Sequence, residues 1–420
     1  MSSRALFWWA VAAALMVGAV TAWHYAGLDL TLSHYDAKGH LVVARRITDS
    51  LRPGWWQIGA VWLPLPHLLN AVPVQVDAWY RTGFSGVVIS VSCFALAVGA
   101  LVWLIHRATG SIAGAAAGAV VLASQPDVLY LQSTPMTEPL LMALTLGGVA
   151  LTWRWVQEGA TAPPTAPGVV LALAMLTRYE AWPITVAALG AAAVALAVSG
   201  QPIGRAIRRV AVLAVYPTVA VLAFLALSRA TVGAWFVTGG FFVADNLDYH
   251  RPFKAAGSVW WGLRKLNGNV TVGLGVAGLA LVAWAILRDR THRALLVTLA
   301  LAGSAALPIY AFYQGHPFRV RYMVVLAMSL AASSGLGVGL LPRLQLPAAA
   351  AVAGAALIWT PPWSSTAPMV LEAQWDRPHS VDRRAVRACL VRDRRGEPIL
   401  ASMGSLAHLM QETAADGIFL

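Results

Sequence analysis

Long apolar segments separated by short polar ones run through most of the sequence. A helix needs about 20 apolar residues to cross the hydrocarbon core of a bilayer, and eleven segments meet or approach that length. They are residues 6–26, 84–105, 111–131, 139–156, 167–177, 182–199, 210–228, 269–287, 294–313, 322–341 and 347–360. The fifth and eleventh are short, and the fifth and sixth could form one broken unit. The pattern predicts an all-α polytopic membrane protein with about eleven transmembrane helices.

The distribution of Arg residues predicts the orientation of these helices, because short cytoplasmic loops carry an excess of Lys and Arg. With the N-terminus inside, ten Arg residues fall in cytoplasmic segments. Only Arg178, Arg319 and Arg321 fall in short outer loops. An odd number of spans then puts the C-terminus outside. Trp pairs within the two long outer loops, about 27–83 and 229–268, predict juxtamembrane helices on the outer leaflet.

The composition agrees with this prediction. Of the 420 residues, 58% are hydrophobic and 11% are charged, whereas about a quarter of the residues in soluble domains are charged. So few charges exclude a soluble globule and a disordered chain, and two Cys residues exclude a disulfide scaffold. The net charge of +12 does not indicate a nucleic-acid partner, because no basic stripe exists outside the topology-setting loops and the tail.

The character of the chain changes at about residue 361. The last 60 residues hold seven acidic residues and seven Arg, against eleven acidic residues in the first 360. We therefore predict two units, a transmembrane domain over 1–360 and an extracytoplasmic segment over 361–420. The segment is expected to be a small α/β module, cut short at its end. Its helices would span 380–391 and 405–414, and its strands 399–402 and 417–420.

The acidic residues of the first 360 positions lie mostly on the predicted outer side. The cytoplasmic segments hold two, Glu158 and Asp289. The outer side holds nine, Asp29, Asp36, Asp49, Asp77, Asp127, Glu138, Glu180, Asp245 and Asp248. Acidic residues contribute little to membrane topology, so the asymmetry needs another cause. It predicts a polar surface at the outer mouth that binds a substrate or a metal ion.

Two of these acids open helices, and each has two interpretations. Asp36 could cap the amphipathic helix that follows it, or it could act as a general base with His40 four residues later on the same helical face. Glu138 precedes Pro139 and favours a helix start through the helix dipole. Because it lies on the same side of the membrane as Asp36, a functional role is the alternative.

Three charged segments on the outer side also remain open. Arg178 and Glu180 interrupt two apolar runs, either as a functional pair or as a pair that neutralises itself. His250 and Arg251 lie in a loop rich in potential metal and phosphate ligands, although such residues are common in solvated loops. Arg319 and Arg321 could snorkel to the interface or could clamp a lipid phosphate.

Taken in order, these segments resemble the GT-C superfamily of membrane glycosyltransferases, nearest to the protein O-mannosyltransferases and the lipid A aminoarabinose transferase. The resemblance covers about residues 1–360. It rests on four segments, Tyr35-Asp36-Ala37, Thr137-Glu138-Pro139, Leu176 to Trp182, and Arg321-Tyr322. One departure is that the protein O-mannosyltransferases carry an Asp-Glu pair where Ala37 follows Asp36, which weakens the case for protein acceptors.

The resemblance implies a multi-pass enzyme of the bacterial plasma membrane with its active site outside. It would move a sugar from a polyprenyl-phosphate donor to an acceptor hydroxyl with inversion, and Asp36 would be the base. The catalytic residues implied are Asp36 and Glu138; the candidate phosphate-binding residues are Arg178, Arg251, Arg319 and Arg321; and the candidate substrate-binding residues are Tyr35, His40, Tyr179, Glu180 and Tyr322. Some members bind a divalent metal such as Mg, Mn or Zn, for which Glu138, His40 and His250 are the candidate ligands here.

Two other classes of protein compete with this interpretation. A lipid or solute transporter would place ionisable residues and broken helices near the membrane midplane, whereas the acids here lie toward one face. A non-catalytic lipid-binding subunit would tolerate the loss of the Asp36 carboxylate. The position of the acids favours an enzyme over both.

Overall fold

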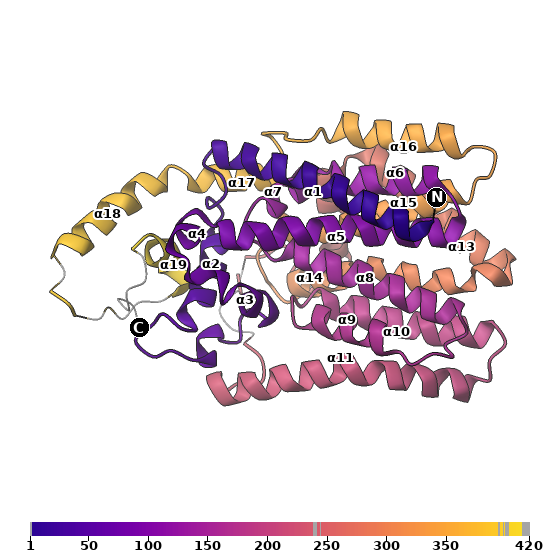
Figure 1. The fold of residues 1–420 in the computed structure, drawn as a ribbon, viewed down its shortest axis with the longest axis horizontal. Coiled ribbons are helices and arrows are strands. Elements are labelled where there is room, and N and C mark those ends of the chain that lie inside the picture. Colours follow the sequence, from indigo (N-terminus) through magenta and orange to yellow (C-terminus); the bar gives the residue numbers. More distant parts are fainter. Residues whose placement is uncertain are drawn as a thin grey trace.

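The computed structural model describes residues 2–237, 242–243, 245–393, 395–397, 399 and 403–413. Long helices run side by side along one axis and form a bundle (Figure 1). The shorter helices that precede α5 gather at one end of this bundle, together with α18 and α19, and α1 begins at the other end.

The helices have the following bounds. The first part comprises α1 (Ser3–Gly27), α2 (Tyr35–Arg46), η1 (Trp55–Ile58), α3 (Leu65–Asn70), η2 (Pro73–Gln75), α4 (Asp77–Thr82), α5 (Phe84–Thr109), α6 (Ile112–Ala123), α7 (Pro126–Gln132) and α8 (Glu138–Gln157). The middle part comprises α9 (Thr165–Met175), α10 (Ala181–Val198), α11 (Ile203–Val232), α12 (Pro252–Asn267), α13 (Asn269–Arg288), η3 (Arg290–Ala305) and α14 (Ala306–Tyr313). The last part comprises η4 (Val320–Leu326), α15 (Ala327–Gly339), α16 (Gln345–Trp359), α17 (Pro368–Asp376), α18 (His379–Asp393) and α19 (Met403–Glu412).

Every segment predicted to span the membrane is helical for most of its length. Among the described residues, eight helical segments are long and apolar enough to cross a bilayer, or nine if the bent pair α6 and α7 is one span. The remaining two predicted spans correspond to the short apolar helices α9 and α16. The polytopic all-α class is therefore confirmed, while the number eleven stays a prediction.

The predicted span 111–131 is not one continuous helix. It bends by 67° between α6 and α7. Pro126 opens α7, and the side chain of Gln125 caps it by accepting a hydrogen bond of 2.6 Å from the backbone N–H of Val128. Since a proline cannot donate to the preceding turn, the helix ends before it and a new one starts. After the bend, α7 contacts α1, α5, α8 and α17.

Glycines let two helices in the middle of the bundle approach closely. Gly114 and Gly118 of α6 face Gly335 and Gly339 of α15. A Cβ atom added at Gly114 would lie 2.6 Å from the carbonyl oxygen of Gly335. Small residues four positions apart are a usual interface between membrane helices, where packing replaces the hydrophobic effect. This contact fixes α15, the most buried of the candidate spans, and so fixes η4, which carries Arg321.

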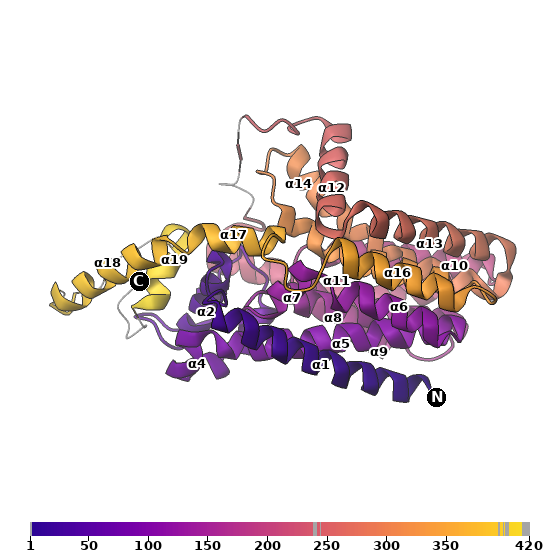
Figure 2. The same ribbon diagram turned by 90° about the horizontal axis from the view of Figure 1, so that it is seen from above.

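The first outer loop folds into short helices, as the sequence predicts, and they pack at one end of the bundle (Figure 1). The other predicted surface helix, α12, runs across the bundle axis (Figure 2). Trp260 and Trp261 of α12 are about half exposed. A helix in this direction would lie in the plane of a membrane that the bundle crosses.

The tail begins by packing onto the bundle. The backbone N–H of Met369 in α17 donates a 2.8 Å hydrogen bond to the buried carboxylate of Asp127, and the indole N–H of Trp363 donates to Thr21 at 2.9 Å. The expected tail helices correspond to α18 and α19. Most of the expected strand 399–402, and the whole of 417–420, lie outside the described residues.

Candidate active site

The first turn of α2 positions Asp36. The helix is capped by His34, whose Nδ1 accepts a 3.2 Å hydrogen bond from the backbone N–H of Asp36. The interpretation of Asp36 as the cap is therefore wrong, because the imidazole takes that place. The carboxylate of Asp36 is left to face the interior of the site, where it is one-fifth exposed.

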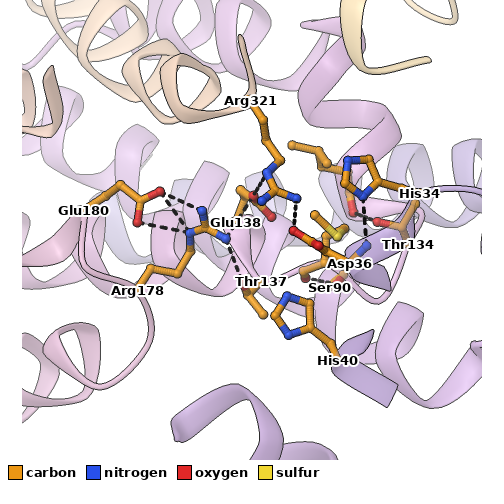
Figure 3. A network of polar contacts seen from close by, with 12 residues as sticks. His34, Asp36, His40, Ser90, Thr134, Thr137, Glu138, Arg178, Glu180 and Arg321 are labelled. Carbon is orange, nitrogen blue, oxygen red and sulfur yellow. Dashed lines mark hydrogen bonds and ion pairs between the residues drawn. The ribbon is translucent and has the colours of Figure 1, made fainter. Parts of the chain in front are cut away.

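Arg321 joins two carboxylates that are far apart in the sequence. Its Nη1 lies 2.5 Å from Oδ2 of Asp36, and its Nε lies 3.5 Å from Oε1 of Glu138 (Figure 3). The three residues come from α2, η4 and the start of α8. Because α8 and η4 are held in the bundle, their packing sets the position of the guanidinium group relative to both acids.

Arg178 extends the network from the other side (Figure 3). It lies in the break between α9 and α10. Its Nη1 is 3.0 Å from Oε1 of Glu138 and donates to Oγ1 of Thr137 at 3.0 Å, and its Nη2 is 2.7 Å from Oε1 of Glu180. The Arg178–Glu180 pair does form, but Arg178 also contacts Glu138, so it is not merely a local pair that neutralises itself.

Glu138 is the most enclosed member of the network, with 1% of its side chain exposed. Two guanidinium groups lie within ion-pair distance of it. Neither of its oxygens has a partner with hydrogen-bond geometry among the described residues. Removing a carboxylate from water is costly unless it is paired, and Arg178 and Arg321 supply that pairing. Its lone pairs remain available to a hydroxyl group.

Charge interactions at Asp36 outweigh its burial. Burial alone would raise the pKa of the Asp36 carboxyl, but Arg321 together with His34 and His40 lowers it well below its usual range. Asp36 is therefore ionised in this arrangement, as a general base must be. While Arg321 remains this close, however, the carboxylate is a weak base.

The tautomer of His40 follows from its hydrogen bonds. Nδ1 of His67 lies 3.2 Å from the carbonyl oxygen of Leu63, which can only accept, so this nitrogen carries the proton. In the neutral ring Nε2 of His67 is then an acceptor, and it receives the Nδ1–H of His40 at 3.1 Å. Nε2 of His40 is left as an acceptor. It is buried and has no hydrogen-bond partner among the described residues.

This pair of neutral imidazoles predicts that acid destabilises the protein. Burial lowers the pKa of His67 to about 4, against about 6.5 in an unfolded chain. Between these values the unfolded chain binds more protons, so stability is lost as the pH falls from about 6.5 to about 4. We expect His67→Phe to make this decline shallower, and thermal unfolding across a pH series measures it. An equally steep decline would contradict the prediction, with the exposed His379→Phe as the control.

The three Tyr residues predicted to bind substrate each make a contact through the hydroxyl group. Tyr322 follows Arg321 and its hydroxyl lies 3.3 Å from Nε2 of His316. The hydroxyl of Tyr179 donates to the carbonyl of Ala60 at 3.3 Å, and that of Tyr35 accepts from the backbone of Ala407 at 3.3 Å.

Two of the predicted phosphate-binding residues are not part of the network. The side chain of Arg319 is more than half exposed and forms an ion pair with Glu372, at 3.7 Å. Arg251 is exposed at the start of α12, where Pro252 begins the helix. The structure therefore brings together Asp36, His40, Glu138, Arg178, Glu180 and Arg321, as Figure 3 shows.

Comparison with known proteins establishes the fold. No protein-family model and no curated protein matches the sequence. Among solved structures, ArnT from Cupriavidus metallidurans bound to undecaprenyl phosphate is similar, with a TM-score of 0.62 and 14% identity over 98% of this chain and 85% of ArnT. The Archaeoglobus fulgidus oligosaccharyltransferase in complex with Zn and sulfate has a TM-score of 0.56 and 12% identity over 96% of this chain and 62% of that enzyme.

Both neighbours are GT-C glycosyltransferases. This chain has the GT-C fold. The apo form of ArnT is also similar, with a TM-score of 0.51 and 16% identity over 95% of this chain and 75% of ArnT. At identities of 12–16% the similarity extends to the fold alone.

The predicted metal ligands do not fit a metal ion. The described residues contain no group of three or more His, Cys, Asp or Glu side chains placed to hold one. Instead, guanidinium groups contact Glu138, His40 bonds to His67, and His250 stacks on Tyr313 with ring centroids 5.4 Å apart. The assignment of Glu138, His40 and His250 to one site is therefore corrected.

Sequence reasoning missed several residues of the site in this GT-C bundle. His67 and Thr137 contact members of the network, and Glu372 reaches it from the tail. Burial would raise the pKa of Glu372, but a hydrogen bond and the charge of His34, with Arg321 and Arg319, lower it. Its only signal in the sequence is an acid in an apolar stretch, which does not show that α17 folds back onto α7.

Proposed function

We propose that this chain is a membrane glycosyltransferase that moves a sugar from a polyprenyl-phosphate donor to an acceptor hydroxyl. The observation that carries the proposal is Arg321, which contacts Asp36 and Glu138 at one end of a bundle with the GT-C fold. Attack by a hydroxyl requires a base, and departure of a phosphate requires a cation. Asp36 and Arg321 are a base and a cation in direct contact. ArnT, which shares the fold, has been described bound to undecaprenyl phosphate.

In the proposed reaction, a carboxylate oxygen of Asp36 takes the proton of the acceptor hydroxyl as its oxygen attacks the anomeric carbon. The bond from that carbon to the phosphate oxygen breaks, and the electron pair leaves with the polyprenyl phosphate. Attack from the face opposite the phosphate inverts the anomeric configuration. Arg321 would stabilise the charge that develops on the phosphate, and Arg178 would contribute from behind Glu138.

The contact between Asp36 and Arg321 suggests how donor binding could activate the base. The phosphodiester of the donor can take two hydrogen bonds from one guanidinium group, and it gains a second negative charge as the sugar leaves. When the donor phosphate draws Arg321 away, Asp36 loses the cation that lowers its pKa most. Its burial then raises the pKa, so Asp36 becomes a stronger base only when the leaving group is in place.

Two further residues would hold hydroxyl groups. The oxygens of Glu138 accept no hydrogen bond from the described residues, and His40 presents Nε2 as a buried acceptor. Sugars and alcohols carry the donors that such acceptors need. We assign the acceptor hydroxyl to Asp36 and sugar hydroxyls to Glu138 and His40. A divalent ion like the Zn of the oligosaccharyltransferase would need a ligand set other than the one expected from the sequence.

The same proposal includes the location of the chain and its orientation in the membrane. Residues 1–360 would form the transmembrane domain of a multi-pass protein in the bacterial inner membrane, with the N-terminus in the cytoplasm. Residues 361–420 would form an outer segment. The positive-inside distribution of Arg supports this orientation, and the site then faces the side where lipid-linked donors are used.

Turnover of lipid-linked donors tests the function. The full-length protein in proteoliposomes is supplied with radiolabelled sugars on undecaprenyl phosphate, or with nucleotide sugars, and with cell-envelope extract as the source of acceptors. We expect release of undecaprenyl phosphate with at least one lipid-linked sugar and none of the nucleotide sugars to be consumed. Consumption of nucleotide sugars alone, or of no donor, would overturn the proposal.

Exchange of Arg321 between Asp36 and phosphate predicts a difference between two pH profiles. The acid limb of kcat/KM reports the pKa of the base in the free enzyme. The acid limb of kcat reports its pKa in the enzyme–substrate complex. Since Asp36 must be ionised and its pKa is lowered in the free enzyme, kcat/KM should stay level down to a lower pH than kcat does. Initial rates from about pH 4 to about pH 8 should therefore show the acid limb of kcat while kcat/KM stays level. Coincident acid limbs would contradict the exchange.

A further inference from the structure

A second polar cavity, of about 180 Å³, lies on the other side of α2 from Asp36. Lys38, two positions after Asp36, lines it, and side chains two positions apart point to different sides of a helix. Its lining comes from the loop after α1 and from α2, α4, α18 and α19. The basic residues are Lys38, Arg81, Arg377, Arg383 and Arg384.

Among the described residues that line the cavity, basic side chains outnumber acidic ones. Asp29 and Glu412 are the acidic residues in this lining, against five basic ones, an excess of three positive charges. Glu412 is already committed to Lys38, at 2.6 Å. Asp29 makes no ion pair with any described residue.

Three of the guanidinium groups have no ion-pair partner among the described residues. The side chains of Arg81, Arg377 and Arg384 form no ion pair in the part of the chain that the structure describes. Cations gathered around one cavity repel each other, and this repulsion is relieved by a bound anion. Arg is the residue best suited to phosphate, because its planar group donates two parallel hydrogen bonds. The pattern therefore resembles a phosphate site rather than a scattered solvated surface.

The depth of the cavity indicates where the phosphate would come from. Asp29 and Ser33 follow directly after α1, and Arg81 comes three residues before α5 begins. Both helices are candidate spans, so the cavity lies at the level where they leave the membrane. Phosphates at that level belong to lipid headgroups or to soluble molecules that approach the surface.

We propose that this cavity is an anion site that holds a phosphate group next to, and separate from, the Asp36 site. The two sites share α2, which carries Asp36 on one side and Lys38 on the other. A phosphate held there would also tie the tail to the first outer loop, because its ligands come from both. The proposal stands whatever reaction occurs at Asp36.

Binding of two phosphate probes tests the proposal on the full-length protein in nanodiscs. The test variant is Arg377→Gln with Arg384→Gln. The control variant is Arg392→Gln with Arg395→Gln, which removes the same charge from exposed positions outside the cavity. Calorimetry with inorganic phosphate in phosphatidylcholine nanodiscs probes a free phosphate. Native mass spectrometry after exchange into phosphatidylglycerol probes a lipid phosphate.

Loss of two phosphate ligands should weaken binding by about tenfold or more relative to the control variant. If only the retention of phosphatidylglycerol falls, the phosphate comes from a lipid. If the affinity for inorganic phosphate falls, the site takes the free group. If the test and control variants bind both probes equally, or if the wild-type protein binds neither, the proposal is overturned.

Discussion

Replacement of Asp36 by Asn is expected to reduce sugar transfer by about 10²–10⁴-fold, the usual contribution of a general base. The amide keeps the size of the side chain but cannot take a proton from a hydroxyl. The fold should be retained, because His34 caps α2 and Arg321 keeps its contact with Glu138. Single-turnover transfer from the lipid-linked donor in proteoliposomes measures the loss.

A matched control separates the role of Asp36 from a general effect of charge. Asp245→Asn removes an exposed acid from the second long outer loop and should leave turnover unchanged. Thermal unfolding of the Asp36 variant should show that it is folded. Turnover at the wild-type rate in a folded Asp36→Asn protein would remove Asp36 from the mechanism and would favour the non-catalytic alternative.

The largest expected effect on stability comes from Glu138. Its replacement by Gln leaves Arg178 and Arg321 without the carboxylate that lies within ion-pair distance of both. Loss of one partner of a buried pair typically costs about 3–5 kcal/mol. We expect a cost near the lower end, because Glu180 and Asp36 remain beside the two Arg residues. Unfolding in detergent, followed by heating or by denaturant, measures the difference.

The control for Glu138 is an exposed pair with similar chemistry. Glu158 lies 2.8 Å from Arg154 one turn away in the sequence, and both side chains are about half exposed. Glu158→Gln should cost only about 0.3–0.5 kcal/mol, as exposed helix pairs do. If the two variants lost equal stability, the burial of Glu138 would not have the energetic consequence described here.

The sequence predicts the helices of the bundle well, for a physical reason. An apolar segment of 20 residues has one stable state in a bilayer, because its backbone must satisfy all its hydrogen bonds internally. The predicted span 269–287 is α13, Asn269–Arg288, and 182–199 is α10, Ala181–Val198. The failure at 111–131 has a local cause, Pro126, whose effect on the direction of the chain depends on the contacts of α7.

The sequence predicted only some of the residues of the site. The excess of acids on the outer side pointed to Asp36, Glu138 and Glu180, and all three lie in one network. The same reasoning included Arg251 and His250, which lie outside this network. A loop rich in charged residues does not show which of them come close to the other site residues in space. His67 gave no signal, and the signal of Glu372, an acid in an apolar stretch, did not show where it lies. Each becomes part of the site only through packing.

By itself the sequence determined the class of protein and the positions of most helices, and it predicts the side on which the chemistry would occur. Hydropathy and the count of Arg are sums over segments, so they need no contacts. Only the tertiary structure decided that Arg321 contacts Asp36 and Glu138, that His40 offers Nε2, and that five basic residues enclose a cavity. Each of these depends on side chains from distant helices, whose separation is set by packing such as that of Gly114 on Gly335.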